Sequence, residues 1–226
     1  MNQQHSSRNA RTVQSKTPVL LVGGGYPAAS DIVENKALAP TVVAADGGAN
    51  FCLSAGVKPA FVIGDLDSLS DDIRAELPED AVIEFADQDL TDFEKCLRLI
   101  EAPLVIAAGF TAGRLDHTLA NFAVLARRIG PPTVLLDSED LAFAAPEKLR
   151  ISLPPGSRFS LFPMEPTRGT SKGLKWPIDG LTLDPLGRLG TSNEVSGAVD
   201  LSFERPGTIV LIPRAHLTAV LEALTG

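Results

Sequence analysis

Two aspartates, Asp65 and Asp67, follow the apolar run 61–64 with one residue between them. Alternate residues of an extended chain point the same way, so both carboxylates are expected to face one spot at the end of a buried strand. Two carboxylates about 4 Å apart repel by about 4 kcal/mol at an effective dielectric near 20. A divalent cation would turn this repulsion into ligation, and Mg²⁺ favours carboxylates together with substrate phosphates. A polar turn that caps the next short helix explains the same residues, so this segment alone leaves both interpretations open.

Further acidic residues follow neighbouring apolar runs. Asp46 comes directly after one run, and Asp92 comes shortly after another. The carboxyl ends of parallel strands are where open α/β sheets bind ligands. Each residue also has a structural explanation, because Asp46 suits an N-cap or turn and Asp92 suits the first turn of a helix that Thr91 and Glu94 would open as a capping box. The site interpretation therefore depends on how the elements are arranged.

Short apolar runs alternate with helical segments over the first two thirds of the chain. This alternation predicts a mostly parallel, Rossmann-like α/β sheet. In the helix that opens near residue 114, the spacing predicts core-facing positions at Leu115, Leu119, Phe122, Ala126 and Ile129. The predicted strands are 18–22, 41–45, the run ending at 64, 81–85, 104–108, 133–137 and 141–145, and the predicted helices lie near 29–36, 51–55 and 71–77 and begin near 91 and 114.

The pattern changes after Pro146. Short runs between Pro and Gly turns predict a smaller all-β sandwich, closed by a helix near 215–224. We therefore expect a disordered tail over 1–17, an α/β domain over 18–146 and a β-sandwich domain over 147–226. The predicted strands of this last part are 151–153, 159–163, 181–183, 199–203 and 208–212.

The composition narrows the class of protein. The 226 residues are 44% hydrophobic and 21% charged, with a net charge of −8, which is typical of a globular chain with ample core material. The acidic balance without a Lys/Arg cluster argues against a general nucleic-acid binder. No apolar run approaches the ~20 residues of a membrane span. Cys52 and Cys96 are far apart and form no CxxC motif, so we expect two reduced thiols in a reducing compartment. We expect a cytoplasmic protein that binds neither nucleic acid nor membrane.

Six segments carry a resemblance to a known family. In chain order they are Asp46-Gly-Gly-Ala-Asn50, Gly64-Asp-Leu-Asp-Ser68, Asp87-Gln-Asp-Leu-Thr-Asp-Phe-Glu-Lys95, Gly113-Arg-Leu-Asp-His-Thr118, Gly173-Leu-Lys-Trp-Pro177 and Thr191-Ser-Asn-Glu194. Together they closely resemble the motifs of thiamine pyrophosphokinases (thiamine diphosphokinases), from about residue 18 to residue 213. One departure is Ala112, where the family often has glycine; the change removes no functional group.

The resemblance implies an activity and a set of site residues. The expected reaction transfers a diphosphate from ATP to the hydroxyl of thiamine, giving thiamine diphosphate and AMP, and the expected assembly is a homodimer with thiamine bound between the α/β domain of one subunit and the β domain of the other. Carried over by position, the Mg²⁺ ligands are Asp65, Asp67 and Asp92. Asp46 would support this catalytic site, and Gln88 would lie near thiamine. Arg114 and Asp116 would serve the nucleotide phosphates or orient the metal site. The β domain would supply Trp176, Ser192 and Asn193 to the thiamine pocket.

Three other functions fit parts of the same pattern. A diphosphokinase for another alcohol, such as a hydroxymethylpterin, would keep the metal-binding acids without the Trp176 and Ser192-Asn193 motifs. A metal-dependent phosphohydrolase built on Asp65 and Asp67 would release phosphate without an acceptor alcohol. A non-catalytic thiamine-binding module would not need an intact acidic cluster. Since Trp176 lies in a polar stretch, ring stacking on a cationic thiazolium is favoured over core packing.

Overall fold

The computed structural model describes residues 11–65, 74, 77–85, 87 and 89–226. The predicted site residues Asp67 and Gln88, and nearly all of the helix predicted near 71–77, lie outside these ranges. The other predicted site residues are all described.

The first half of the chain forms a parallel sheet in the order β8-β7-β2-β3-β4-β5. Its central strands are buried apolar runs, as the sequence predicts. The order reverses between β2 and β7, so the loops beyond these two strands open a crevice at the carboxyl edge. The strands are β2 (Val19–Val22), β3 (Thr41–Ala45), β4 (Phe61–Gly64), β5 (Val82–Glu84), β7 (Val105–Ala108) and β8 (Thr133–Leu136).

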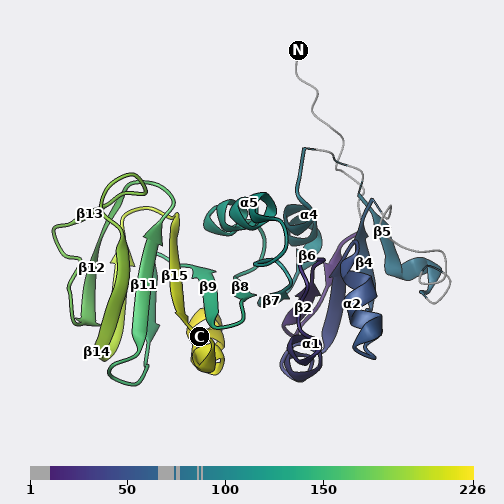
Figure 1. The fold of residues 1–226 in the computed structure, drawn as a ribbon, viewed down its shortest axis with the longest axis horizontal. Helices are drawn as coiled ribbons and strands as arrows, with labels where there is room; N and C mark the ends of the chain where they lie inside the picture. Colours follow the sequence, from purple (N-terminus) through teal and green to yellow (C-terminus); the bar gives the residue numbers. More distant parts are fainter. Residues whose placement is uncertain (1–10, 66–73, 75–76, 86, 88) are drawn as a thin grey trace, which may run out of the picture.

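Helices cover both faces of this sheet (Figure 1). Alternate residues of β2 point to opposite faces, so Leu20 joins one apolar cluster and Leu21 joins the other. The helices packed with Leu20 are α1 (Ala29–Asn35), α2 (Gly48–Ser54) and the C-terminal α6 (Leu217–Thr225), whereas those packed with Leu21 are α4 (Asp92–Leu99) and α5 (Leu115–Ala126).

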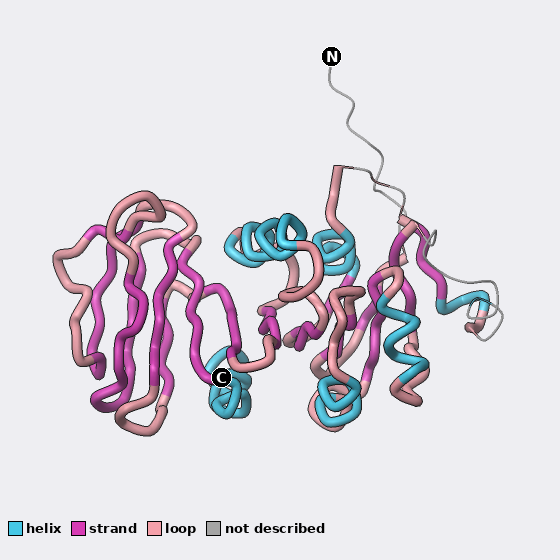
Figure 2. The backbone as a smooth tube through the Cα atoms, in the orientation of Figure 1, coloured by secondary structure: helices cyan, strands magenta, loops and turns pink. Residues whose placement is uncertain are grey.

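The sheet continues without a break into an antiparallel, strand-rich half (Figure 2). Strand β9 (Asp140–Ala144) pairs antiparallel with β8 on one side and with β15 (Thr208–Pro213) on the other. The boundary predicted at residue 146 therefore separates two strands that are hydrogen-bonded neighbours. The fold is α/β with one large mixed sheet. Its remaining strands are β10 (Lys148–Ile151), β11 (Arg158–Pro163), β12 (Thr167–Leu174), β13 (Thr182–Leu183) and β14 (Gly190–Phe203).

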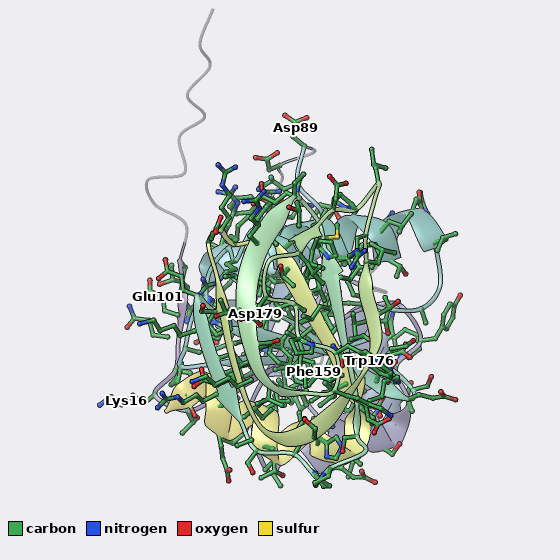
Figure 3. All side chains as sticks on the ribbon, turned by 90° about the vertical axis from the view of Figure 1, so that its left-hand side faces the viewer. Lys16, Asp89, Glu101, Phe159, Trp176 and Asp179 are labelled. Atoms are coloured by element: carbon green, nitrogen blue, oxygen red, sulfur yellow. The ribbon has the colours of Figure 1, made fainter. Side chains whose placement is uncertain are left out.

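The long strand β14 belongs to two pairings. Its first part pairs with β11, and its second part lies between β10 and β12. The buried side chains of these strands, among them Phe159 of β11 and Leu201 of β14, belong to the same apolar cluster as Leu20 of the parallel sheet; Phe159 is labelled near the centre of Figure 3.

Four expectations need correction. Residues 13–14 are not tail, because β1 (Val13–Gln14) pairs with β6 (Ile100–Glu101) and Val13 is fully buried. Strand β12 was not predicted, since its sequence is polar and rich in glycine. The predicted strand 199–203 is only the last part of β14. Leu115 and Leu119 are 72% and 63% exposed, because only the C-terminal half of α5 packs on the sheet.

The short 3₁₀ turns are η1 (Glu79–Ala81) and η2 (Arg214–His216). Among the described helices, none combines the length and the apolar character that a membrane crossing needs.

Candidate functional site

Three acidic residues lie at the carboxyl edge of the parallel sheet, one after each of three neighbouring strands. Asp46 follows β3, Asp65 follows β4, and Asp92 begins α4 after β5. Parallel pairing brings the ends of these strands to one edge, as expected from the sequence. Together with Lys95 of α4, these three aspartates are called the acidic edge below.

Asp46 is held in an unusual backbone conformation. Its φ is +44°, and its N–H donates to the carbonyl of Ile63 at 2.8 Å, which fastens the turn to β4. Such a conformation costs a non-glycine residue about 1–3 kcal/mol. Gly64 is required beside it, because a Cβ at Gly64 would lie 2.9 Å from the Cβ of Asp46. The strained turn thus holds the Asp46 side chain close against the backbone at Gly64.

The Asp46 carboxylate has an unused acceptor. The residue is 8% exposed, and its Oδ1 is buried without a hydrogen-bond partner among the described residues. Burying an unsatisfied polar atom costs about 1–3 kcal/mol. A ligand that supplies a positive charge or a donor would remove this cost.

Lys95 connects the acids to one another. Its side chain is 4% exposed, and its Nζ lies 3.0 Å from Asp92 Oδ1 and 3.8 Å from Asp65 Oδ2. Burial alone would lower the pKa of Lys95, but the hydrogen bond to Asp92 and the nearby charges of Asp92, Asp65 and Asp46 raise it above its ordinary value. Lys95 is therefore a buried ammonium held among carboxylates.

Two sets of contacts position the helix that carries Lys95. Thr91 accepts the Glu94 N–H at 3.2 Å, which confirms Thr91 as the N-cap. The predicted capping box is only half formed among the described residues, because the Glu94 carboxylate turns to two arginines instead. The Glu94 side chain is 4% exposed and accepts from Arg98 on its own helix and from both terminal nitrogens of Arg127, just beyond α5. Burial would raise the pKa of Glu94, but these two guanidinium groups lower it overall. The buried carboxylate of Glu94, paired with the half-exposed Arg127, thus fastens α4 to the end of α5.

The donor chemistry of the acidic edge fits a hard divalent cation. Carboxylate oxygens are the ligands that Mg²⁺ prefers, and Asp46 Oδ1 is buried and unpartnered. Within the described ranges, no three His, Cys, Asp or Glu side chains converge closely enough to hold a metal ion. The predicted ligand Asp67 lies outside those ranges.

A hollow of about 470 Å³ lies beyond the carboxyl ends of β2, β7 and β8, on the same edge of the sheet. Arg214 reaches it from the C-terminal segment, with its Nη2 2.6 Å from Asp31 Oδ1 and its Nη1 donating to the Asp137 carbonyl at 3.0 Å. The loop of Gly109 and Thr111 forms its other side. The hollow occupies the crevice expected between β2 and β7.

Arg114 and Asp116 lie next to this loop, where α5 begins. They pair with each other at 2.6 Å, and both are exposed. The hydrogen bond from Arg114 is the main reason that the pKa of Asp116 falls to about 2. Asp116 is therefore ionised at neutral pH and neutralises the guanidinium that was expected to meet phosphate.

The remaining predicted residues form a second cluster in the strand-rich half. Lys175, Trp176, Ser192, Asn193 and Glu194 are called the tryptophan corner below. Trp176 is 54% exposed, and Figure 3 labels it on the strand-rich half. Its exposure excludes core packing as the reason for the only tryptophan of the chain.

Asn193 holds the backbone of Trp176. The Asn193 side chain is buried, its Oδ1 accepts the Trp176 N–H at 3.1 Å, and its Nδ2 donates to the Trp176 carbonyl at 2.7 Å. Both ends of the amide are thus engaged inside the protein. Ser192 adopts a φ of +60°, and its N–H donates to Ser160 Oγ at 3.0 Å.

Lys175 lies over the indole of Trp176. Its Nζ is 4.9 Å from the ring centroid and 3.1 Å from Glu194 Oε2. The ring therefore already contacts one cation, which is the type of partner that an electron-rich ring face attracts.

The structure places Asp46, Asp65 and Asp92 at one edge of the sheet, where Lys95 contacts two of them, whereas the tryptophan corner lies many strands away. Seven strand steps along the sheet separate β14 from β3, which is roughly 30 Å at about 4.8 Å per step. Two residues at these sites were not predicted. Lys95 lies in one of the six matching segments but was given no role, although its place three residues after Asp92 was a usable signal. Arg214 had no local signal, since its partner Asp31 is 183 residues away.

Comparison with known proteins identifies the family of this chain. The family model described as "Thiamin pyrophosphokinase, catalytic domain" matches residues 34–133, and "Thiamin pyrophosphokinase, vitamin B1 binding domain" matches residues 148–207. Thiamine pyrophosphokinase 1 of Oryza sativa subsp. japonica is 31% identical over 157 residues, which are 61% of this chain and 60% of that protein. Thiamine pyrophosphokinase 2 of Arabidopsis thaliana is 28% identical over 185 residues, 67% of this chain and 69% of that protein. The chain thus spans about 60% of the length of the rice relative that it matches.

Solved structures show the same fold. Thiamin pyrophosphokinase from Candida albicans superposes with a TM-score of 0.72 at 18% identity, over 90% of this chain and 92% of that chain. A protein from Lactobacillus plantarum superposes with a TM-score of 0.68 at 27% identity, over 87% and 98%. The two family models together match well over half of the residues, and the chain belongs to the thiamine pyrophosphokinase family.

Proposed function

We propose that this chain is a thiamine diphosphokinase, which transfers a diphosphate from ATP to thiamine. The thiamine hydroxyl oxygen bonds to the β-phosphorus of ATP, the bond between the β-phosphorus and the α–β bridging oxygen breaks, and AMP leaves with that oxygen. The observation that carries this proposal is the acidic edge. It places three carboxylates and a buried ammonium inside the segment that matches the family's catalytic model.

We assign Mg²⁺ to Asp65, Asp67 and Asp92, with Asp46 supporting the same site. When bound, the cation would offset the charge of the phosphates and of the leaving group. The chain's own contribution is to hold the carboxylates in place through Lys95, Gly64 and the strained Asp46 turn. An aspartate of this edge would accept the proton of the hydroxyl, since an alcohol is a poor nucleophile.

We assign the nucleoside end of ATP to the hollow beyond β2, β7 and β8. It lies at the same sheet edge as the acidic edge, in the crevice where the strand order reverses. Arg114 and Asp116 border the loop that forms one side of the hollow, so they would meet the phosphates between hollow and cation. Release of Arg114 from Asp116 would be needed for a direct phosphate contact.

We assign thiamine recognition to the tryptophan corner, with Gln88 completing the pocket from the catalytic half. The exposed face of Trp176 suits the cationic thiazolium and the aromatic pyrimidine. Asn193 was expected to contact thiamine, but its side-chain amide is hydrogen-bonded to the Trp176 backbone. Its role in this proposal is therefore to position the ring. Ser192 remains a candidate for direct contact. The division into an α/β catalytic domain and a β-sandwich thiamine-binding domain follows from this assignment.

We further propose a homodimer whose sites each combine two subunits. Within one chain, roughly 30 Å of sheet separates the acidic edge from the tryptophan corner, more than thiamine diphosphate could span. The exposed stripe of Leu115 and Leu119 on α5 offers an apolar surface that a second copy could cover. A cytoplasmic location fits this activity.

A direct assay tests the proposed function. Purified protein is mixed with ATP, Mg²⁺ and thiamine, and AMP and thiamine diphosphate are followed by chromatography with each component omitted in turn. Equal amounts of both products, none without thiamine or metal, are expected. ADP or free phosphate as the main product, or AMP formed without thiamine, would contradict the proposal and favour another acceptor or a hydrolase.

A further inference from the structure

Lys95 is an unusual residue to find between metal-binding acids. Lysine is rarely buried without a counter-charge, and this side chain is 4% exposed in the part of the chain that the structure describes. Its ammonium contacts Asp92 at 3.0 Å and Asp65 at 3.8 Å, two of the three carboxylates assigned above to the cation.

The lysine and a metal ion therefore compete for the same negative charge. A divalent cation at Asp65 and Asp92 would lie within a few ångströms of the ammonium, and like charges at that separation repel strongly in a partly buried site. The ammonium pairs with Asp65 and Asp92 without any metal ion, so these two carboxylates do not need a metal in order to stay close to each other.

A bound polyphosphate reverses this balance. Its oxygens bring several negative charges to the same edge, which then holds more negative charge than one ammonium neutralises. Of the three N–H donors of Lys95, the hydrogen bond to Asp92 uses one, and an ammonium can direct a further donor to a phosphate oxygen.

We propose that Lys95 is an internal counter-ion that keeps the acidic edge assembled without metal and weakens its affinity for a free divalent cation, so that the cation enters together with the triphosphate. This inference rests on the proposed metal site and deepens it by assigning a role to a residue outside the ligand set. Lys95 thus acts through the aspartates as a positioning and charge-setting residue.

The test measures metal binding instead of turnover. Titration of the full-length protein with Mn²⁺ alone, followed by calorimetry or by electron paramagnetic resonance of free Mn²⁺, compares the wild type with Lys95→Gln and Lys95→Arg. Lys95→Gln removes the charge while keeping a donor for Asp92, and Lys95→Arg keeps the charge. Arg98→Gln is the matched control, because it removes a cation from the same helix that contacts Glu94 and not the acidic edge.

We expect Lys95→Gln to bind Mn²⁺ about tenfold more tightly, the effect of removing one nearby like charge, with Lys95→Arg and Arg98→Gln within about twofold of the wild type. Circular dichroism and thermal melting establish that each variant is folded; should Lys95→Gln not fold, Lys95→Met takes its place. Unchanged or weaker Mn²⁺ binding in the folded charge-removing variant would overturn the proposal. The titration needs neither ATP nor thiamine. Its result can therefore be interpreted even if the chain does not transfer diphosphate to thiamine.

Discussion

The acidic edge and the tryptophan corner are built on opposite principles. The acidic edge is held by charge: a buried ammonium joins Asp65 and Asp92, and a buried carboxylate, Glu94, fixes the helix that carries it. In the tryptophan corner, the backbone of Trp176 is held by two neutral hydrogen bonds, one donated by its N–H to Asn193 Oδ1 and one accepted by its carbonyl from Asn193 Nδ2.

The difference matches the work that each region would do. At the acidic edge the group left unsatisfied is a carboxylate oxygen of Asp46, which invites a cation. At the tryptophan corner, the exposed group is the indole ring of Trp176, which suits binding of a flat, cationic ligand. Charge should therefore dominate turnover and pH response at the first region, and shape should dominate substrate affinity at the second.

The largest effect is expected at the acidic edge itself. Asp65→Asn keeps the shape of the side chain but removes one anion, and turnover should fall about 10²–10³-fold, the usual loss when one preorganised electrostatic group is removed. Melting should change little. Glu84→Gln, an exposed acid at the end of β5, is the matched control and should keep normal turnover. Near-normal turnover in folded Asp65→Asn would remove the basis of the metal assignment.

The support of the acidic edge should be pH-dependent, whereas that of the tryptophan corner should not. Glu94→Gln should cost about 2–3 kcal/mol at pH 7, at or below the usual range for a broken buried pair because Arg98 and Arg127 are half-exposed. The folded-state pKa of Glu94 is lowered, so its stabilisation is present above its ordinary pKa of 4.5 and is lost as the pH falls through the folded value. The wild type and Glu94→Gln should therefore approach one another in stability below about pH 4.5.

Chemical unfolding at several pH values measures this. Asn193→Ala serves as the contrast, with a loss of about 1–3 kcal/mol from unsatisfied backbone groups that stays constant over the same pH range. A Glu94→Gln deficit that did not shrink in acid would mean that packing, and not the ion pair, joins α4 to α5.

Substrate affinity should respond at the tryptophan corner with a smaller effect. Trp176→Ala should raise the KM for thiamine about tenfold and leave the KM for ATP nearly unchanged, since a cation over a ring contributes about 0.5–2 kcal/mol. Trp176→Phe should lose less, and Asn193→Ala should follow Trp176→Ala in direction. Steady-state kinetics with each substrate varied decides this, and equal changes in both KM values would indicate a structural role.

The smallest effect concerns Lys175, which already occupies the ring face of Trp176. Lys175→Met should tighten thiamine binding about two- to threefold, because the ammonium no longer competes for the ring. As the chain has one tryptophan, the quenching of its fluorescence reports binding directly. Lys172→Met, on the strand β12 that ends just before Lys175, is a control. Weaker binding in Lys175→Met would show that the lysine contacts the substrate or supports the ring.

Much of this arrangement follows from the sequence, because parallel strands are short apolar runs and their ends share one edge. The positions of Asp46, Asp65 and Asp92 could be expected from that rule, as could the N-cap at Thr91. The core-facing prediction for Leu115 and Leu119 was wrong, since helical periodicity identifies an apolar face but not what covers it.

Other features depend on contacts between distant residues. Strand β12 is polar and contains glycine, so no local pattern marks it, yet it pairs along β14. The role of Asn193 on β14 depends on Trp176, which is 17 residues away in the chain and lies just beyond the end of the paired strand β12. The burial of Lys95 depends on the packing of α4 against β4, and helix propensity alone carries no information about it.

The central claim is that each site joins the acidic edge of one subunit to the tryptophan corner of another, and subunit complementation tests it most directly. Asp65→Asn and Trp176→Ala chains are unfolded together, refolded as a mixture and assayed at low thiamine. In a two-fold dimer, every mixed pair has one doubly damaged site and one intact site, so the mixture should recover about a quarter of wild-type activity. Alone, Asp65→Asn should be nearly inactive and Trp176→Ala should keep about a tenth of the activity at low thiamine. If both regions served the same site within one chain, every site would carry one defect, and activity no higher than the average of the two variants would contradict the account.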